Sequence, residues 1–220
     1  IDLDAMRSAM TDDVKLVYLC NPNNPIPSII EKNSLRDFCI EMSKRAIVLV
    51  DEAYYEYVNN PDFESMKSLV TEHKNIIVCR TASKIHGFAG VRMGFAFAHP
   101  ETMRLITGPF NLSLSNVAVA GAVESYQDTE YQTFIKQKNR ESMDILEKMF
   151  KDLNYEYIKS NSNFAFFNAG RPSTEVATAL KKHGIISGRP FPPFTNWVRM
   201  STVKPEEMQY VVDAYRKEFG

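Results

Sequence analysis

Short runs of β-branched and aliphatic residues alternate with polar segments of helical length between residues 15 and 99, and this alternation constrains the fold most strongly. The runs lie at 16–20, 46–50, 76–79 and 94–98, and a helix with Ser34 as its N-cap is expected over 34–45. The run at 46–50 is nearly all aliphatic, which is typical of a strand buried on both faces. The pattern predicts an α/β fold with a mixed, mostly parallel sheet.

The pattern changes after residue 127. Residues 128–153 predict one long helix with Asp144/Lys148 and Glu147/Lys151 as i, i+4 ion pairs. Beyond it we expect strands at 164–167, 184–187 and 197–201, a helix at 173–183 and a final helix from Pro205. The sequence thus predicts part of a large domain at 1–127, a linking helix at 128–153 and a small α+β domain at 154–220.

Charge, hydropathy and cysteine content exclude several classes of protein. Twenty-six basic and 27 acidic residues leave a formal charge of −1 without a block of like charge, so no nucleic-acid partner is expected. The longest apolar stretches, 117–123 and 46–50, fall far short of the roughly 18 residues of a membrane helix, so we expect no membrane partner. Three cysteines without C-x-x-C spacing fit a reducing, cytoplasmic location, and four scattered histidines predict no metal site.

Polar residues of reactive types follow three of the predicted strands. The cluster at 21–25 follows the first strand, Asp51 and Tyr54 follow the second, and 81–84 follow the third. In open α/β sheets, ligands bind at the carboxyl ends of the strands. We therefore expect these side chains to gather at one edge of the sheet.

Each of these residues also has a purely structural interpretation. Taken alone, Lys84 is more typical of a solvated loop lysine, Asp51 of a cap or turn, and Tyr54 of half-buried packing. The Asn and Pro cluster is typical of a rigid turn. Arg92 is either a surface residue or a bidentate phosphate ligand. Arg199, inside an apolar strand, requires an anionic partner, either a structural carboxylate or that of a substrate.

Together, an amine, a carboxylate, a phenol, an amide and an arginine at one sheet edge are what pyridoxal phosphate requires.

Three motifs carry a family resemblance: Asn-Pro-Asn-Asn-Pro at 21–25, Asp-Glu-Ala-Tyr at 51–54, and Thr-Ala-Ser-Lys-Ile-His-Gly-Phe-Ala-Gly-Val-Arg-Met-Gly at 81–94. They resemble the fold-type I, class I/II aminotransferases, most closely the histidinol-phosphate aminotransferase-like branch, over essentially the whole chain. The resemblance implies an enzyme that uses pyridoxal 5'-phosphate to move an amino group between an L-amino acid, or a related amine such as histidinol phosphate, and a 2-oxo acid. It also implies a homodimer.

The resemblance assigns a role to each site residue. Lys84 would be the Schiff-base lysine that then serves as general acid and base, and Asp51 would pair with the pyridine nitrogen. The other implied contacts are with the ring's phenolic oxygen for Tyr54 and Asn24, with the cofactor phosphate for Thr81, Ser83 and Arg92, and with the substrate α-carboxylate for Arg199 and Asn163.

Two departures and one absence qualify the resemblance. Residues 24–27 read Asn-Pro-Ile-Pro where the family has Asn-Pro-Thr-Gly, so the local turn is expected to differ. Arg189 is shifted within 184–189, so histidinol phosphate is not assigned as the substrate. The chain opens on Ile1 and has no counterpart of the family's upstream phosphate-capping loop, so we expect the N-terminal third to be missing. The alternatives are a decarboxylase of the threonine-phosphate type and a non-catalytic, truncated cofactor-binding module.

Overall fold

The computed structural model describes residues 1–107 and 114–220. They form two compact units: unit 1 comprises residues 1–23 and 29–129, and unit 2 comprises residues 24–28 and 130–220. The assignment of 24–28 to unit 2 is not predicted by the sequence. The division into domains at residues 127 and 153 stays a prediction.

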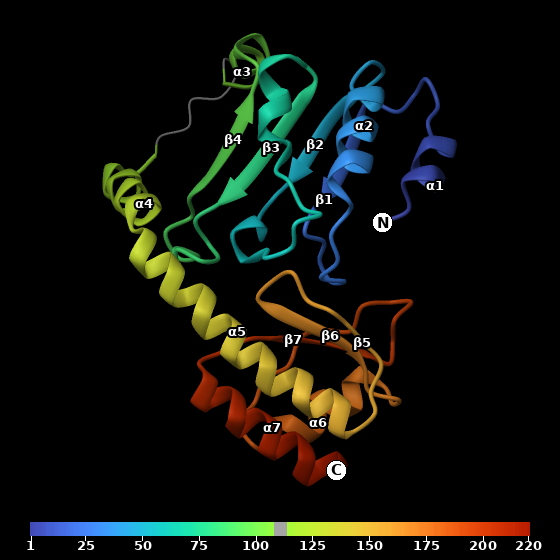
Figure 1. Ribbon diagram of the computed structural model, residues 1–220, viewed down its shortest axis with the longest axis vertical. Coiled ribbons are helices and arrows are strands. Elements are labelled where there is room, and N and C mark those ends of the chain that lie inside the picture. Colours follow the sequence, from blue (N-terminus) through green and yellow to red (C-terminus); the bar gives the residue numbers. More distant parts are fainter. Residues whose placement is uncertain (108–113) are drawn as a thin grey trace. The chain divides into compact units, whose positions relative to one another are not determined.

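Unit 1 is built around a four-stranded sheet in the order β1-β2-β3-β4 (Figure 1). The first three strands are parallel, and β4 runs antiparallel to β3. The register places Asp51 opposite both Cys20 and Cys79, so the carboxyl ends of the three parallel strands meet at one edge. The strands are β1 Leu16–Cys20, β2 Ile47–Asp51, β3 Ile76–Thr81 and β4 Gly94–Ala98.

The core of unit 1 forms where the aliphatic strands meet helix α2, Lys32–Met42. Val48 and Val50 of β2 are fully buried against Leu35 and Phe38 of α2. The expected N-cap at Ser34 is wrong, because the Glu31 carboxylate accepts hydrogen bonds from the backbone N–H groups of residues 33 and 34 and starts the helix earlier. The remaining elements are α1 Leu3–Ser8, η1 Tyr55–Tyr57, η2 Met66–Thr71, α3 Pro100–Thr107 and α4 Asn116–Gln127.

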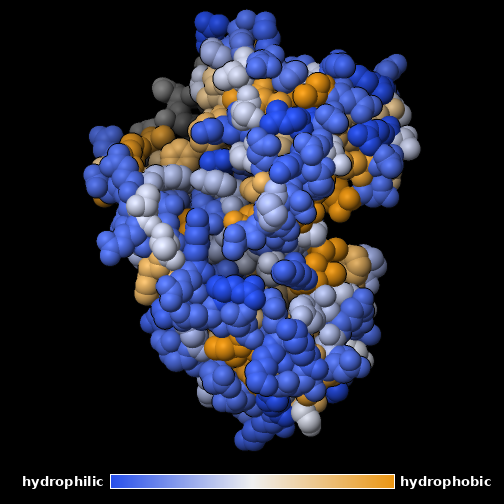
Figure 2. All heavy atoms as spheres, viewed as in Figure 1, coloured by the Kyte–Doolittle hydropathy of each residue, from blue (hydrophilic) through white to orange (hydrophobic). Residues whose placement is uncertain are grey.

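Unit 2 contains a three-stranded antiparallel sheet in the order β5-β6-β7. Its core packs Phe167 of β6 and Val198 of β7 against Phe150 of the long helix and Tyr215 of the last helix. In Figure 2 the surface over these helices is mostly hydrophilic, as expected for helices with one buried stripe. The elements are α5 Thr129–Asp152, β5 Tyr157–Ile158, β6 Phe164–Asn168, α6 Ser173–Lys181, β7 Trp197–Ser201 and α7 Pro205–Phe219.

Two details of the prediction for unit 2 are wrong. Residues 184–187 form no strand: Ile186 is 91% exposed, and the segment pairs with no other strand of the described chain. The expected ion pairs Asp144/Lys148 and Glu147/Lys151 are also not formed. Instead, Arg140 pairs with Asp144, and Lys148 pairs with Asp152, each pair being one helical turn apart.

Within the described residues, no helix combines the length and the apolar character needed to cross a bilayer. Nor do the His, Cys, Asp and Glu side chains of these residues form a group of three or more able to hold a metal ion.

Candidate active site

The carboxylate of Asp51, the last residue of β2, is held by two donors. The Tyr18 hydroxyl donates to Oδ2 at 2.8 Å, and the backbone N–H of Ala53 donates to Oδ1 at 3.0 Å. Burial and the bond to Asp51 raise the pKa of the Tyr18 hydroxyl, so it stays protonated and donating at neutral pH. Asp51 is thus an oriented, half-buried acceptor at the edge where ligands of such sheets bind.

Lys84 lies in the turn after β3, and its side chain is partly buried. Its Nζ is 5.1 Å from the centroid of the Tyr54 ring, and Tyr54 itself is 4% exposed. In the described part of the chain, the ammonium of Lys84 makes neither an ion pair nor a hydrogen bond. The structure therefore brings Lys84 close to Tyr54, which lies three positions after Asp51 in the sequence.

The turn between β3 and Lys84 is closed by hydroxyl and backbone groups. Thr81 Oγ1 accepts a hydrogen bond from the backbone N–H of Ser83 at 3.1 Å and donates to the Met93 carbonyl at 3.2 Å. These bonds hold the predicted phosphate ligands Thr81 and Ser83 next to each other, just before Lys84.

Arg92 lies on the exposed surface of the segment before β4. Its backbone is in the left-handed region, with φ of 61°, and its Nη1 donates to the Ala89 carbonyl at 2.8 Å. No bond between Arg92 and the Thr81–Ser83 turn is formed. The predicted grouping of these three residues around a phosphate therefore stays a prediction.

The other predicted site residues belong to unit 2. Asn24 is exposed at the start of the segment 24–28. That segment is tied to the loop before β6, because the backbone N–H and the side-chain amide of Asn161 both donate to the Pro27 carbonyl, at 3.0 and 3.3 Å. Asn163 lies two residues further along the same loop. The structure thus brings the segments of Asn24 and Asn163 together.

Arg199 lies half-buried on β7, on the face of the sheet opposite to the core helices. Its guanidinium lies 3.9 Å from the centroid of the Phe164 ring, and its Nη1 donates to Ser201 Oγ at 3.3 Å. Asn163 directly precedes Phe164, and its carbonyl accepts a bond from the Thr202 backbone N–H at 2.9 Å. Arg199 and Asn163 therefore occupy one corner of unit 2.

A buried ion pair that the sequence does not predict supports the edge of the sheet in unit 1. Arg80 donates through Nε and Nη2 to Glu52 Oε2 at 3.0 and 2.9 Å, and the two side chains are 10% and 1% exposed. Glu52 directly follows Asp51, and Arg80 directly precedes Thr81. In the sequence, the only indication of this ion pair is that a charged residue lies just after each of the aliphatic runs at 46–50 and 76–79. Tyr18 was missed as well, although it shares the face of Cys20, which pairs with Asp51.

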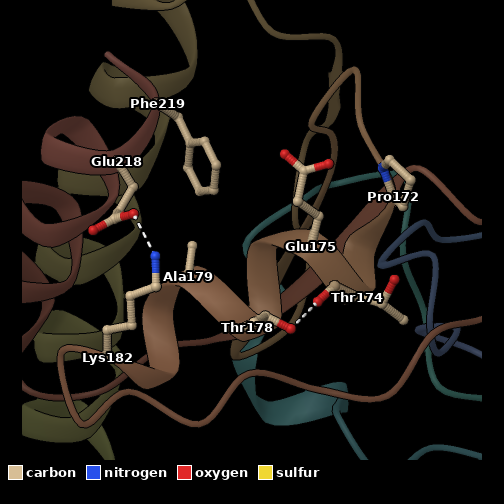
Figure 3. Close-up of a pocket in the computed structure, with 8 residues that line it drawn as sticks. All are labelled: Pro172, Thr174, Glu175, Thr178, Ala179, Lys182, Glu218 and Phe219. Carbon is tan, nitrogen blue, oxygen red and sulfur yellow. Dashed lines mark hydrogen bonds and ion pairs between the residues drawn. The ribbon is translucent and has the colours of Figure 1, made fainter.

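Unit 2 also contains a pocket. It is lined by α6 together with the end of α7, and Figure 3 shows Lys182 directed toward Glu218, with 3.6 Å between Nζ and Oε2. Thr178 Oγ1 is bonded back to the carbonyl of Thr174 in its own helix. None of the predicted site residues lines this pocket.

Comparisons with known proteins identify the family to which the chain belongs. The family model for aminotransferase class I and II matches residues 1–214. The chain belongs to the class I and II aminotransferase family. The histidinol-phosphate aminotransferase of Symbiobacterium thermophilum is 34% identical over 223 residues, covering 100% of this chain and 61% of that protein.

Solved structures show the aminotransferase fold directly. A structure from Erwinia carotovora atroseptica superposes with a TM-score of 0.94 at 34% identity, over 98% of this chain and 64% of that one. The histidinol-phosphate aminotransferase of Sinorhizobium meliloti in complex with pyridoxal-5'-phosphate gives a TM-score of 0.88 at 25% identity, over 99% and 62%. The predicted family and fold class are thus confirmed. The chain spans about three fifths of the length of the curated relative from Symbiobacterium thermophilum.

Proposed function

We propose that the protein containing this chain is a pyridoxal 5'-phosphate-dependent aminotransferase. It would move an amino group from an L-amino acid, or a related amine such as histidinol phosphate, to a 2-oxo acid. The observation that carries the proposal is the partly buried amine of Lys84 over the Tyr54 ring, in a chain of the aminotransferase family. A homodimer remains a prediction from the family resemblance, and a cytoplasmic location remains a prediction from the cysteine content.

The donor set of unit 1 fits the cofactor. Lys84 offers a primary amine that makes no ion pair within the described residues, and Asp51 offers a carboxylate already oriented by two donors. Thr81 and Ser83 add two hydroxyl groups on one tight turn. When bound, pyridoxal phosphate supplies an aldehyde for amino groups and a protonated ring that withdraws electrons from the reacting carbon.

Each residue would then perform one task. The Lys84 amine would hold the cofactor through its aldehyde carbon, with release of water, and, once a substrate amine has displaced it, would carry a proton away from and back to the substrate. The Asp51 carboxylate would accept the hydrogen bond of the protonated ring nitrogen. The hydroxyl of Tyr54 and the amide of Asn24 would donate to the phenolic oxygen, and Thr81, Ser83 and Arg92 would bind the phosphate. Arg199, beside Asn163, binds the substrate carboxylate as a planar, bidentate donor.

The Lys84→Ala variant tests the proposal, with Lys67→Ala as a matched control in the same unit. Purified protein is mixed with pyridoxal phosphate, and its visible absorbance is recorded before reduction with borohydride and peptide mass spectrometry. We expect the absorbance band and the covalent label in wild type and in Lys67→Ala, and neither in Lys84→Ala. A label that persists in Lys84→Ala removes Lys84 from this role.

Product analysis separates the alternatives. With candidate amino acids, formation of a 2-oxo acid together with amino-group transfer supports an aminotransferase. Release of carbon dioxide without a 2-oxo acid would instead support the decarboxylase. Cofactor binding without any turnover would support a non-catalytic module.

A further inference from the structure

A buried polar pair in unit 1 lies next to the candidate site and has no task in the proposed function. Its members are His86, two residues after Lys84, and Glu56, two residues after Tyr54. Their side chains are 0% and 4% exposed. Burying groups of this polarity costs free energy unless each meets a partner.

The ring of His86 is fixed in both position and plane. Nε2 lies 3.6 Å from Glu56 Oε1, and Nδ1 lies 2.8 Å from the hydroxyl oxygen of Ser125. The ring also stacks on Tyr126, with 3.9 Å between centroids and an angle of 24° between planes. Because Ser125 and Tyr126 both belong to α4, His86 joins this helix to the segment that contains Glu56.

Glu56 faces His86 across 3.6 Å, and the two groups share no hydrogen bond. In the described part of the chain, neither carboxylate oxygen of Glu56 makes a hydrogen bond. The neighbouring cation, Arg80, is bonded to Glu52 and to Ser65 instead. The burial of Tyr126 and the nearby charge of Glu56 both raise the pKa of the Tyr126 hydroxyl. The imidazole of His86 is thus the group placed to offset the buried carboxylate.

The short turn that joins Lys84 to His86 is stiff. The backbone N–H of Gly87 donates to the Lys84 carbonyl at 3.0 Å, and that of Phe88 donates to the Ala82 carbonyl at 2.9 Å. Ala82 and Ile85, on either side of Lys84, are 0% and 1% exposed. A displacement of His86 must therefore move the backbone at Lys84, just as a displacement of Glu56 must move η1 beside Tyr54.

We propose that Glu56 and His86 are positioning residues that hold the Lys84 amine over the Tyr54 ring. Their contact joins the two segments from which Lys84 and Tyr54 project, and α4 fixes the histidine from the other side. The inference rests on the proposed function, because it concerns the amine to which that function assigns the reaction.

The test measures the placement of Lys84 in the cofactor-free protein. Competitive acetylation followed by peptide mass spectrometry gives the rate at Lys84 relative to Lys67, which lies over another ring, 5.4 Å from the centroid of Phe97. His86→Phe keeps the stacked ring and removes both polar contacts. We expect the Lys84/Lys67 ratio to rise about threefold, the factor expected when an ammonium leaves an aromatic face.

Three further variants keep the test decisive. Ser125→Ala removes the hydroxyl that faces Nδ1 and should raise the ratio in the same direction, whereas Ser125→Thr keeps the hydroxyl and should give the wild-type ratio. His183→Phe removes a histidine paired with Glu218 in unit 2, 2.8 Å between Nε2 and Oε1, and should leave the ratio unchanged. Thermal melting identifies which variants fold, and Ser125→Ala decides alone if His86→Phe does not.

An unchanged ratio in a folded His86→Phe protein overturns the proposal, as does an equal ratio in Ser125→Ala and Ser125→Thr or a rise in His183→Phe. The result is independent of the proposed function, because acetylation needs no cofactor. A protein that binds no pyridoxal phosphate would refute the aminotransferase proposal and leave the measured placement valid. Cofactor binding with an unchanged ratio would refute the positioning role alone.

Discussion

Replacing Arg80 by methionine tests whether the buried ion pair supports the edge of the sheet in unit 1. Methionine keeps much of the aliphatic length of arginine and removes the charge. Glu52, 1% exposed, would keep its bonds from Ser65 Oγ at 2.7 Å and the Met66 backbone N–H at 2.8 Å, but would lose its cation.

The expected cost follows from the burial of both partners. Removing one member of a buried ion pair costs about 3–5 kcal/mol, because the remaining charge stays desolvated. The Arg80 guanidinium also lies 3.5 Å from the centroid of the Tyr55 ring, a contact worth about 0.5–2 kcal/mol. Since two donors to Glu52 remain, we expect a total loss of about 4 kcal/mol, compared with a typical domain stability of about 5–15 kcal/mol.

Urea unfolding followed by circular dichroism measures this loss, with Lys74→Met as the control. Lys74 and Glu101 form a pair at 2.6 Å whose side chains are 57% and 51% exposed, so that variant should unfold at the wild-type urea concentration. Adding Glu52→Gln to Arg80→Met should recover part of the stability, because the buried charge is gone. A loss below about 1 kcal/mol in Arg80→Met, or a double variant less stable than Arg80→Met, would refute this account.

Two further predictions concern unit 2. In the active protein, Arg199→Leu should raise KM for amino acids strongly and leave the visible absorbance of the bound cofactor nearly unchanged, whereas loss of that absorbance would indicate a structural arginine. Hydrogen bonds from Arg216 and Lys148 lower the pKa of Asp152. Its contribution to stability is therefore present above its unfolded-state pKa of about 3.9 and is lost as pH falls through the lower folded-state pKa. Melting temperatures of wild type and Asp152→Asn should accordingly differ at neutral pH and converge in acid, and a difference that is constant with pH would contradict this.

The strands of the large sheet could be predicted because uninterrupted aliphatic runs at 46–50 and 76–79 are a strong strand signal, and β2 and β3 contain all of these residues except 46. The expected burial of the run at 46–50 on both faces is wrong, because Val48 and Val50 are buried whereas Ile47 is 40% exposed. The start of α2 could not be predicted, because its N-cap is Glu31, whose longer side chain reaches the same N–H groups as a serine would. The aliphatic run at 184–187 suggested a strand, but an apolar run forms one only where another strand is available to pair with it.

The candidate site could be predicted where residues lie close in sequence, and less well where tertiary structure gathers them. The strand ends identified Asp51, Tyr54 and Lys84, and the structure brings the last two into contact. Tyr18 supports Asp51 and Arg80 pairs with Glu52 because of strand register and burial. Neither register nor burial can be derived from a single sequence. The scattered histidines predict no metal site, and the sequence does not show that His86 packs against a buried carboxylate.

The Pro27 carbonyl that accepts both donors of Asn161 bears on how this protein can be dissected. Because residues 24–28 belong to unit 2, the chain passes between the units at three places, and unit 2 is not one continuous stretch of polypeptide. A gene fragment encoding residues 130–220 alone would omit that carbonyl and leave both amides of Asn161 to solvent. Subcloning or grafting of this unit therefore requires residues 24–28 to be supplied as well, for example as a short peptide fused through a linker.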